Sequence, residues 1–322
     1  MLFQVSDPMT AFASSGSYCN SSTGFCSGSD GQTLVNVQQN TQPQIYIGEI
    51  GNYIHDFTNP KEGISPGVCP GNTQYYEACF QAAPMAGAMV RKAEHQSLGF
   101  AAYYLLGGAQ STWYQQEYSG WSPYCWGWAQ GGRAVSHLGG NFKSVDGYNL
   151  SIVTNTPIIF ADIEGNSGWV STTTTQEQNN RYVFDGFSDY IAGRSPASNQ
   201  NAAQCLGIYP KQSVKYQYGI YSLPNANAAA FQEGKSGTNT YSTYLNTPLW
   251  TTVFDDDYPL PGYTAKPGYP GDFSGFGYPY EAAWFGDSNY HFGWQFWSHG
   301  MTDYDIFSAP ITFYVNGITL GG

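Results

Sequence analysis

Short apolar runs alternate with longer polar or helix-compatible stretches along the 322 residues of the chain. This alternation is typical of βα units that build a parallel sheet, so the sequence predicts an α/β fold. The apolar runs predict strands at residues 2–5, 44–50, 99–106, 157–163, 215–222, 249–254 and 294–297. Apolar positions that recur every three to four residues predict helices at 80–97, 131–138 and 180–191.

We expect one domain over residues 1–322, because no linker divides the chain and α/β barrels of this length often form one unit. Residues 14–33 and 258–280 are rich in Gly, Pro, Ser and aromatic residues and predict ordered loops. The aromatic side chains of the second loop could line a sugar-binding cleft. They could equally cover the barrel or bind a neighbouring subunit, which leaves self-assembly through aromatic loops as a possible partner interaction.

Two carboxylates end the apolar run at 157–163, and they are Asp162 and Glu164. Side chains alternate between the faces of a strand, so these two point the same way, roughly 6.6 Å apart along the backbone. Carboxylates on one face repel each other's ionisation, which raises one pKa and leaves a protonated group beside a charged one. Glycoside hydrolysis needs such a pair. The alternative interpretation is an acidic surface loop at a strand end.

The charge of the chain excludes several partners. With 11 Lys plus Arg, 23 Asp plus Glu and a net charge of −12, the sequence has no clustered cations for a nucleic-acid backbone or an anionic membrane. No apolar stretch is long enough to span a bilayer. The five histidines show no metal-binding spacing, and we expect neither a metal nor another cofactor.

Six cysteines lie in loop-like sequence without zinc-ligand spacing, which favours disulfides and an oxidising compartment. Six cysteines allow fifteen connectivities, and proximity favours Cys19 with Cys26, Cys69 with Cys79, and Cys125 with Cys205. Met1 leads directly into the first predicted strand, with no signal-peptide pattern before it. We therefore expect a mature extracellular or cell-wall-associated form whose export segment has been removed.

The motifs occur in an order that resembles a known family. They are Phe3-Gln4-Val5-Ser6, Tyr46-Ile47-Gly48, residues 99–104, residues 158–164, Tyr218-Gly219-Ile220-Tyr221-Ser222, Leu249-Trp250, Trp294-Gln295-Phe296 and Asp303-Tyr304-Asp305. In this order the chain resembles the secreted glycoside-hydrolase-like domains of actinobacterial cell-wall proteins, which are similar to family 25 lysozymes. The resemblance implies a single modified TIM-type barrel with long disulfide-bonded and aromatic-rich loops, and a site at the carboxyl ends of its strands.

The resemblance also implies roles for individual residues. Glu164 matches the family's proton donor and Asp162 its partner carboxylate. Asp303 and Asp305 match an acidic pair after the last strand, one of which is expected to face the cleft. The aromatic residues expected to bind the sugar are Trp169, Tyr221, Trp250 and Trp294.

One position departs from the family pattern. The acid expected on the first strand aligns with Gln4, a neutral amide that cannot act as a base. Asp7 could substitute for this acid if the strand ended early, and Glu49 is a further acid at the end of the second strand. The alternative interpretation of Glu49 is a solvated loop acid.

Three functions therefore compete. The first is a glycosidase that cleaves a cell-wall amino sugar polymer such as peptidoglycan by carboxylate general acid catalysis. The second is a barrel that binds wall glycan without cutting it, and the third is a structural cell-surface protein. Gln4 distinguishes the first from the second, and the exposure of the aromatic loops distinguishes the second from the third.

Overall fold

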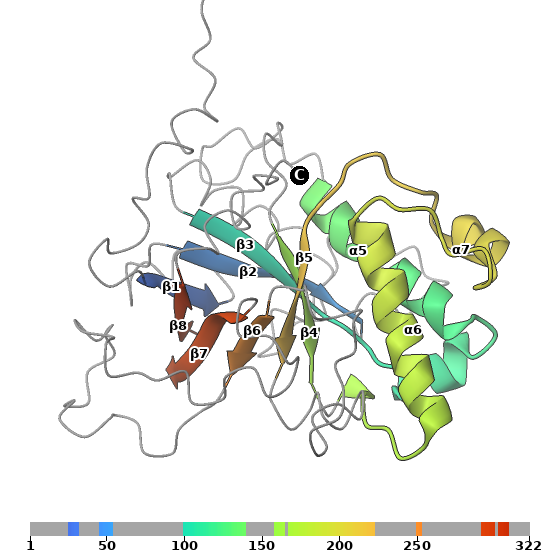
Figure 1. Cartoon of the computed structure of the whole chain (residues 1–322), viewed down its shortest axis with the longest axis horizontal. Coiled ribbons are helices and arrows are strands. Elements are labelled where there is room, and N and C mark those ends of the chain that lie inside the picture. The colour runs from blue at the N-terminus through green and yellow to red at the C-terminus, as the bar shows by residue number, and fades with distance from the viewer. Residues whose placement is uncertain are drawn as a thin grey trace, which may run out of the picture.

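Eight strands form a closed barrel in the order of the chain (Figure 1). The computed structural model describes residues 25–31, 45–53, 99–139, 158–164, 167–222, 249–252, 291–299 and 302–308. The strands are β1 (Phe25–Gly31), β2 (Ile45–Asn52), β3 (Gly99–Leu105), β4 (Ile159–Ile163), β5 (Tyr218–Ser222), β6 (Leu249–Thr252), β7 (His291–His299) and β8 (Thr302–Ser308).

The barrel is mostly parallel. Each strand from β1 to β6 pairs in parallel with the next strand along the chain. Strand β8 closes the barrel by pairing antiparallel with both β7 and β1. The predicted α/β character is therefore confirmed, and the direction of β8 is a departure from an all-parallel barrel.

Six of the predicted strands correspond to β2 through β7, with small shifts at their ends. The strand predicted at residues 2–5 lies outside the described residues. Its expected place beside β2 is taken by β1, which falls within the segment 14–33 that the sequence predicts as a loop. That loop prediction is wrong for Phe25–Gly31. The loop predicted at 258–280 lies outside the described residues.

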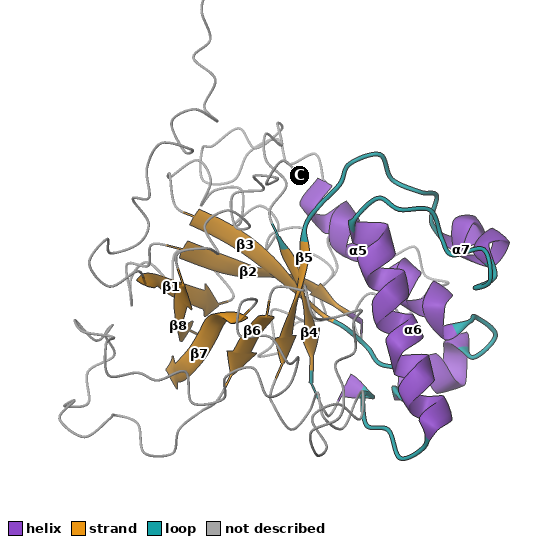
Figure 2. Ribbon diagram, viewed as in Figure 1, coloured by secondary structure: helices purple, strands orange, loops and turns teal. Residues whose placement is uncertain are grey.

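Three helices lie together on one side of the barrel, as Figure 2 shows in purple. They are α5 (Pro123–Gly139), α6 (Thr174–Ile191) and the short α7 (Ala202–Ile208), and a five-residue helix, Tyr114–Tyr118, precedes α5. The helices predicted at 131–138 and 180–191 are parts of α5 and α6, and the one predicted at 80–97 lies outside the described residues. The Thr173 side chain accepts a hydrogen bond from the Gln176 N–H, so a threonine cap begins α6.

The alternation of β4 side chains separates two apolar layers. Ile159, Ala161 and Ile163 pack with side chains of α5 and α6 outside the barrel. Ile158 and Phe160 belong to a second cluster, formed with Ile45, Ile47, Ala101, Tyr221 and Trp250 from the neighbouring strands. Because side chains on a strand alternate, Asp162 shares the face of Phe160 and points into the barrel.

Helices α5 and α6 approach closely where each carries a glycine. A Cβ atom on Gly127 would lie 1.8 Å from the Val183 carbonyl oxygen, and one on Gly186 would lie 1.9 Å from the Tyr124 carbonyl oxygen. Neither position accepts a larger side chain without moving backbone. The two glycines therefore set the distance between these helices.

A disulfide joins Cys125 of α5 to Cys205 of α7, as the sequence predicts. Cys19, Cys69 and Cys79 lie outside the described residues, so the pairs that include them stay predictions. None of the helices within the described ranges combines the length and apolar composition that crossing a bilayer requires.

Candidate functional site

Three acids meet at the carboxyl ends of the parallel strands. Asp162 is the penultimate residue of β4, Glu164 follows that strand, and Glu49 lies near the end of β2. Both Glu164 and Glu49 raise the pKa of Asp162 by charge repulsion, which places the three carboxyl groups close together. The structure therefore brings Glu49 to the pair that the sequence singles out.

Asp162 is the most deeply buried of these acids, with 5% of its surface exposed. Burial is the largest cause that raises its pKa well above the usual value, followed by Glu164 and then Glu49. Its Oδ1 atom is buried without a hydrogen-bond partner among the described residues. The resemblance makes Glu164 the proton donor, whereas the raised pKa described here is that of Asp162. Asp162 is thus the acid of this cluster on which burial and like charges act together against ionisation.

Glu164 is half-buried and faces a tyrosine. The Tyr53 hydroxyl forms a hydrogen bond with the Ser167 side chain, and burial together with the charge of Glu164 raises the pKa of Tyr53. The Ser167 N–H donates to the Glu164 carbonyl oxygen at 3.0 Å. These contacts make Tyr53 and Ser167 part of the site, although the sequence analysis does not name them.

A bulge in β2 shapes the other side of the site. The pairing of β2 with β3 shifts register between Glu49 and Asn52, and the Asn52 Nδ2 atom donates to Glu49 Oε1 at 3.4 Å. Gly51 adopts a φ of +147°, and a Cβ atom there would lie 2.7 Å from Nδ1 of His137. That His137 atom is hydrogen-bonded to the Ile50 carbonyl oxygen. The bulge thus brings the Asn52 amide to the Glu49 carboxylate.

Buried side chains anchor the loop after β3 beside the acids. The Gly107 N–H donates to Gln130 Oε1 at 2.7 Å, and Gln130 Nε2 donates to the Gly107 carbonyl oxygen at 3.0 Å. The Trp126 Nε1 atom also donates to the Gly107 carbonyl, at 2.8 Å. The Leu106 N–H donates to the Asp162 carbonyl oxygen at 2.9 Å. This loop is therefore fixed to both α5 and β4.

Two further side chains hold the loops together from inside. The Trp169 Nε1 atom donates to the Leu106 carbonyl oxygen at 2.6 Å, and the indole has no exposed surface. Asn180 accepts from the Ala109 N–H at 3.2 Å and donates to the Trp169 carbonyl at 2.7 Å. Trp169, which was predicted to bind sugar, is thus placed as a bridge between the loops after β3 and β4.

Aromatic rings fill the barrel next to the acids. Tyr221 stands in register with Asp162, and its ring centroid is 4.3 Å from that of Trp250. Trp250 is 1% exposed and also contacts Tyr103 and Phe160, at 5.9 and 5.4 Å between centroids. Tyr221 is 8% exposed. Tyr221 is therefore the more exposed of the two rings, and the buried Trp250 ring packs against it.

The closing strands add acids at defined register positions. Asp303 and Asp305 lie within β8, where the resemblance implies a position after the last strand, so this part of the prediction is corrected. Asp303 pairs with Asp30 of β1, and Asp30 also pairs with Ile47 of β2. The barrel therefore has an acid near the carboxyl end of its first strand. Asp30 is absent from the predicted site because the sequence predicts the first strand at residues 2–5.

Gln4 and Asp7 lie outside the described residues, and Trp294 is placed on β7 in register with Thr251 and Ile306. Among the residues that the structure describes, no group of three or more His, Cys, Asp or Glu side chains could hold a metal ion.

Comparisons with known proteins do not identify this chain. No family model and no curated protein matches it. Among solved structures, it is similar to an uncharacterized B. stearothermophilus protein, with 15% identity over 87% of this chain and 94% of that chain. The TM-score is 0.38, a likeness too distant to carry an argument.

Proposed function

We propose that this chain is an extracellular or cell-wall-associated glycoside-hydrolase-like protein that acts on an amino sugar glycan of the peptidoglycan type. The observation that carries the proposal is the buried Asp162 carboxyl, whose pKa is raised by burial and by Glu164 and Glu49. Repulsion among neighbouring carboxylates disfavours the ionisation of all three at once, which favours a shared proton that general acid catalysis can use.

The fold supports the same proposal. We infer that the barrel is a modified TIM-type barrel of the kind found in family 25 lysozymes, in which the site lies at the carboxyl ends of the strands. The acids of β2 and β4 lie at those ends. In this proposal Asp30 of β1 takes the role of the first-strand acid that the resemblance expects at Gln4.

The proposed reaction assigns separate roles to the two acids of the pair. The pair shares one proton, which passes to Glu164, the more exposed member, and from there to the glycosidic oxygen as the bond to the anomeric carbon breaks. Asp162 positions the attacking group, either water or the acetamido oxygen of the substrate. Water then adds its hydroxyl to the anomeric carbon and returns one proton to the pair, so atoms and charge balance.

The experiment compares wild type with Glu164→Gln on purified peptidoglycan. The amide keeps the shape of the side chain and removes the transferable proton, so release of reducing ends should fall by at least about 100-fold. Sedimentation with the glycan should be unchanged. Glu117→Gln is the matched control, because Glu117 is an exposed acid outside the site, and it should cut like wild type.

The other outcomes are informative. If neither wild type nor Glu164→Gln cuts while both sediment with the glycan, the chain is a non-catalytic binder. Cleavage that survives Glu164→Gln would show that another carboxyl, Glu49 first, supplies the proton. A wild-type protein that neither cuts nor binds the glycan would contradict the proposal and favour a structural role at the cell surface.

A further inference from the structure

A cavity lies outside the barrel, against the C-terminal half of α6. Its volume is about 300 Å³, at the lower end of the range for small-molecule sites. Its walls come from α5, α6, the segment after α6 and the start of β5, and include Tyr124, Tyr182, Asp185, Asp189, Arg194 and Tyr218. The cavity residue Tyr218 pairs with Ile159 at the start of β4, whereas Asp162 lies near the end of that strand. The cavity is thus separate from the site at Asp162.

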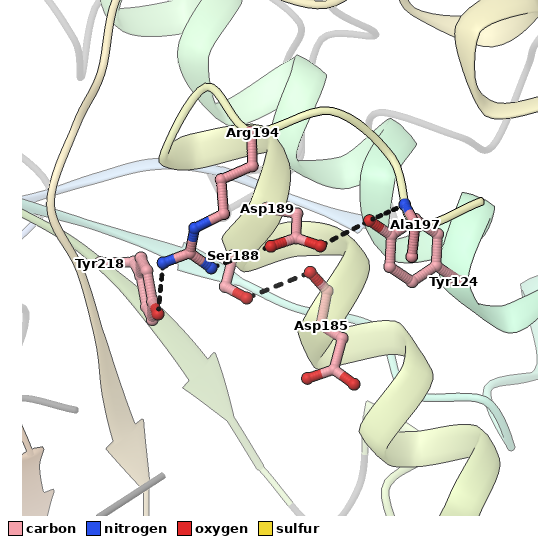
Figure 3. Close-up of polar contacts among 7 residues, drawn as sticks. All are labelled: Tyr124, Asp185, Ser188, Asp189, Arg194, Ala197 and Tyr218. Carbon is pink, nitrogen blue, oxygen red and sulfur yellow. Dashed lines mark hydrogen bonds and ion pairs between the residues drawn. The ribbon is translucent and has the colours of Figure 1, made fainter. Parts of the chain in front are cut away.

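Both carboxylate oxygens of Asp189 accept hydrogen bonds within one wall of this cavity (Figure 3). The Tyr124 hydroxyl donates to Asp189 Oδ2 at 2.6 Å, and it accepts from the Ala197 N–H at 3.1 Å. The Arg194 guanidinium donates to Asp189 Oδ1 at 2.9 Å and to the Tyr218 hydroxyl at 3.1 Å. These bonds satisfy the charge of Asp189 and hold Arg194 in place.

Asp185 differs from Asp189, because its carboxylate makes no hydrogen bond or ion pair with any described residue. In Figure 3 the only dashed line to this residue reaches its carbonyl oxygen, which accepts from the Ser188 hydroxyl at 3.1 Å. Burial, followed by the charge of Asp189, raises the pKa of Asp185 to about 6, and Arg181 and Arg194 lower it. The cavity therefore contains one unpaired acid beside a satisfied acid–arginine pair.

The remaining walls suit a cation better than an anion. The rings of Tyr182, Phe184 and Tyr218 line the cavity, and aromatic faces attract cations. The single arginine of the cavity already contacts Asp189 and lies 5.3 Å from the Tyr218 ring centroid. Two acids against one arginine leave this cavity with one negative charge, and the whole chain carries −12.

We propose that this cavity binds a small organic cation, with an ammonium group paired to Asp185 and an apolar or ring-shaped body against the tyrosines. The site is independent of the proposed glycan chemistry, because none of its wall residues belongs to the acid cluster of the barrel. Activity on glycan and binding at this cavity can therefore fail or succeed separately.

The test uses benzylammonium as the probe and benzyl alcohol as its neutral counterpart of similar shape, measured by calorimetry and ligand-observed NMR. Wild type should bind benzylammonium saturably and benzyl alcohol at least about tenfold more weakly, because a charged pair contributes more than a neutral contact. Asp185→Asn should lower the affinity for benzylammonium by a similar factor. Glu117→Gln, which removes one exposed charge elsewhere, should leave it unchanged.

A pH series on wild type provides a test that does not depend on a variant folding. The probe stays charged between pH 7.5 and 5, while Asp185 gains a proton as the pH falls through about 6, so affinity should drop across this range. The other charged or titratable groups at the cavity are Asp189, Arg194, Tyr124, Tyr182 and Tyr218, and Arg181, which does not line it, also acts on Asp185 by its charge. No binding of benzylammonium, equal binding of the alcohol, binding of neutral glucose in preference, or an unchanged affinity for Asp185→Asn would each overturn the proposal.

Discussion

At the scale of single residues, burial separates the two acids that the sequence presents as equals. Asp162 is enclosed among strand side chains at the end of β4, whereas Glu164 comes after the strand and keeps exposed surface. Water solvates a buried carboxylate less well than an exposed one, so burial disfavours ionisation. The environment of Asp162, and not the chemistry of the carboxyl group, therefore raises its pKa.

This asymmetry predicts how Asp162 affects stability. An acid whose folded pKa lies above its unfolded value makes folding less favourable as the pH rises above the unfolded value, near 4. Asp162→Asn removes this effect. The free energy of unfolding of the variant should therefore increase relative to that of wild type as the pH rises from 4 to 7, by up to about 1.4 kcal/mol per pH unit.

Urea unfolding followed by circular dichroism at several pH values measures this difference. The control is Glu117→Gln, whose stability relative to wild type should change little over the same range. A constant difference between Asp162→Asn and wild type would contradict the assignment, because it would mean that Asp162 ionises at its ordinary pKa.

At the scale of elements, the contact between α5 and α6 depends on two glycines that leave no room for a methyl group. Gly186→Ala would place its Cβ atom 1.9 Å from a backbone oxygen of α5. We expect this substitution to lower the free energy of unfolding by about 2 kcal/mol or more, because backbone has to move. Gly207→Ala is the control, since nothing lies within 4 Å of a Cβ atom there.

In an open helical position alanine is favoured over glycine by about 1 kcal/mol, so Gly207→Ala should leave stability unchanged or raise it. Thermal unfolding of both variants beside wild type gives the comparison. Equal behaviour of the two variants would show that the close approach of the helices relaxes at no cost.

The same scale shows which elements the sequence could predict. Strands β2 to β5 were predictable because their apolar runs are largely buried on both faces. Helix α5 was predicted only in its second half, because residues 124–132 are buried on every side and show no polar stripe. Strand β1 has the sequence FCSGSDG, which lacks the β-branched residues that indicate strands. Strand β8 alternates acidic and apolar residues, a pattern typical of a strand, although no strand was predicted there.

At the scale of the whole molecule, the candidate site combines what is local in sequence with what is not. The pair Asp162 and Glu164 was predictable because two residues of one strand share a face. Tyr53 and Ser167 were not, because their contacts depend on where the loops after β2 and β4 end. Asp30 could be assigned only once the barrel showed which segment pairs with β2.

The disulfide between Cys125 and Cys205 also acts at this scale, since the two residues are 80 positions apart. A cross-link that closes a loop of this length stabilises a fold by about 4.5 kcal/mol in the chain-entropy model. The double variant with alanine at both positions should lose about 2 to 5 kcal/mol in urea unfolding. A loss below about 1 kcal/mol would show that the unfolded chain is little constrained by the bond.

The paired bonds between Gln130 and Gly107 have a consequence for how this protein can vary. The Gln130 amide accepts from the N–H of Gly107 and donates to the carbonyl of the same residue. These are the two hydrogen bonds that a neighbouring strand would otherwise make with that residue. The chain past β3 thus keeps its place without a neighbouring strand there. We expect that insertions or deletions further along that loop can accumulate without displacing the acids, so the periphery can diversify while the acid cluster stays in place.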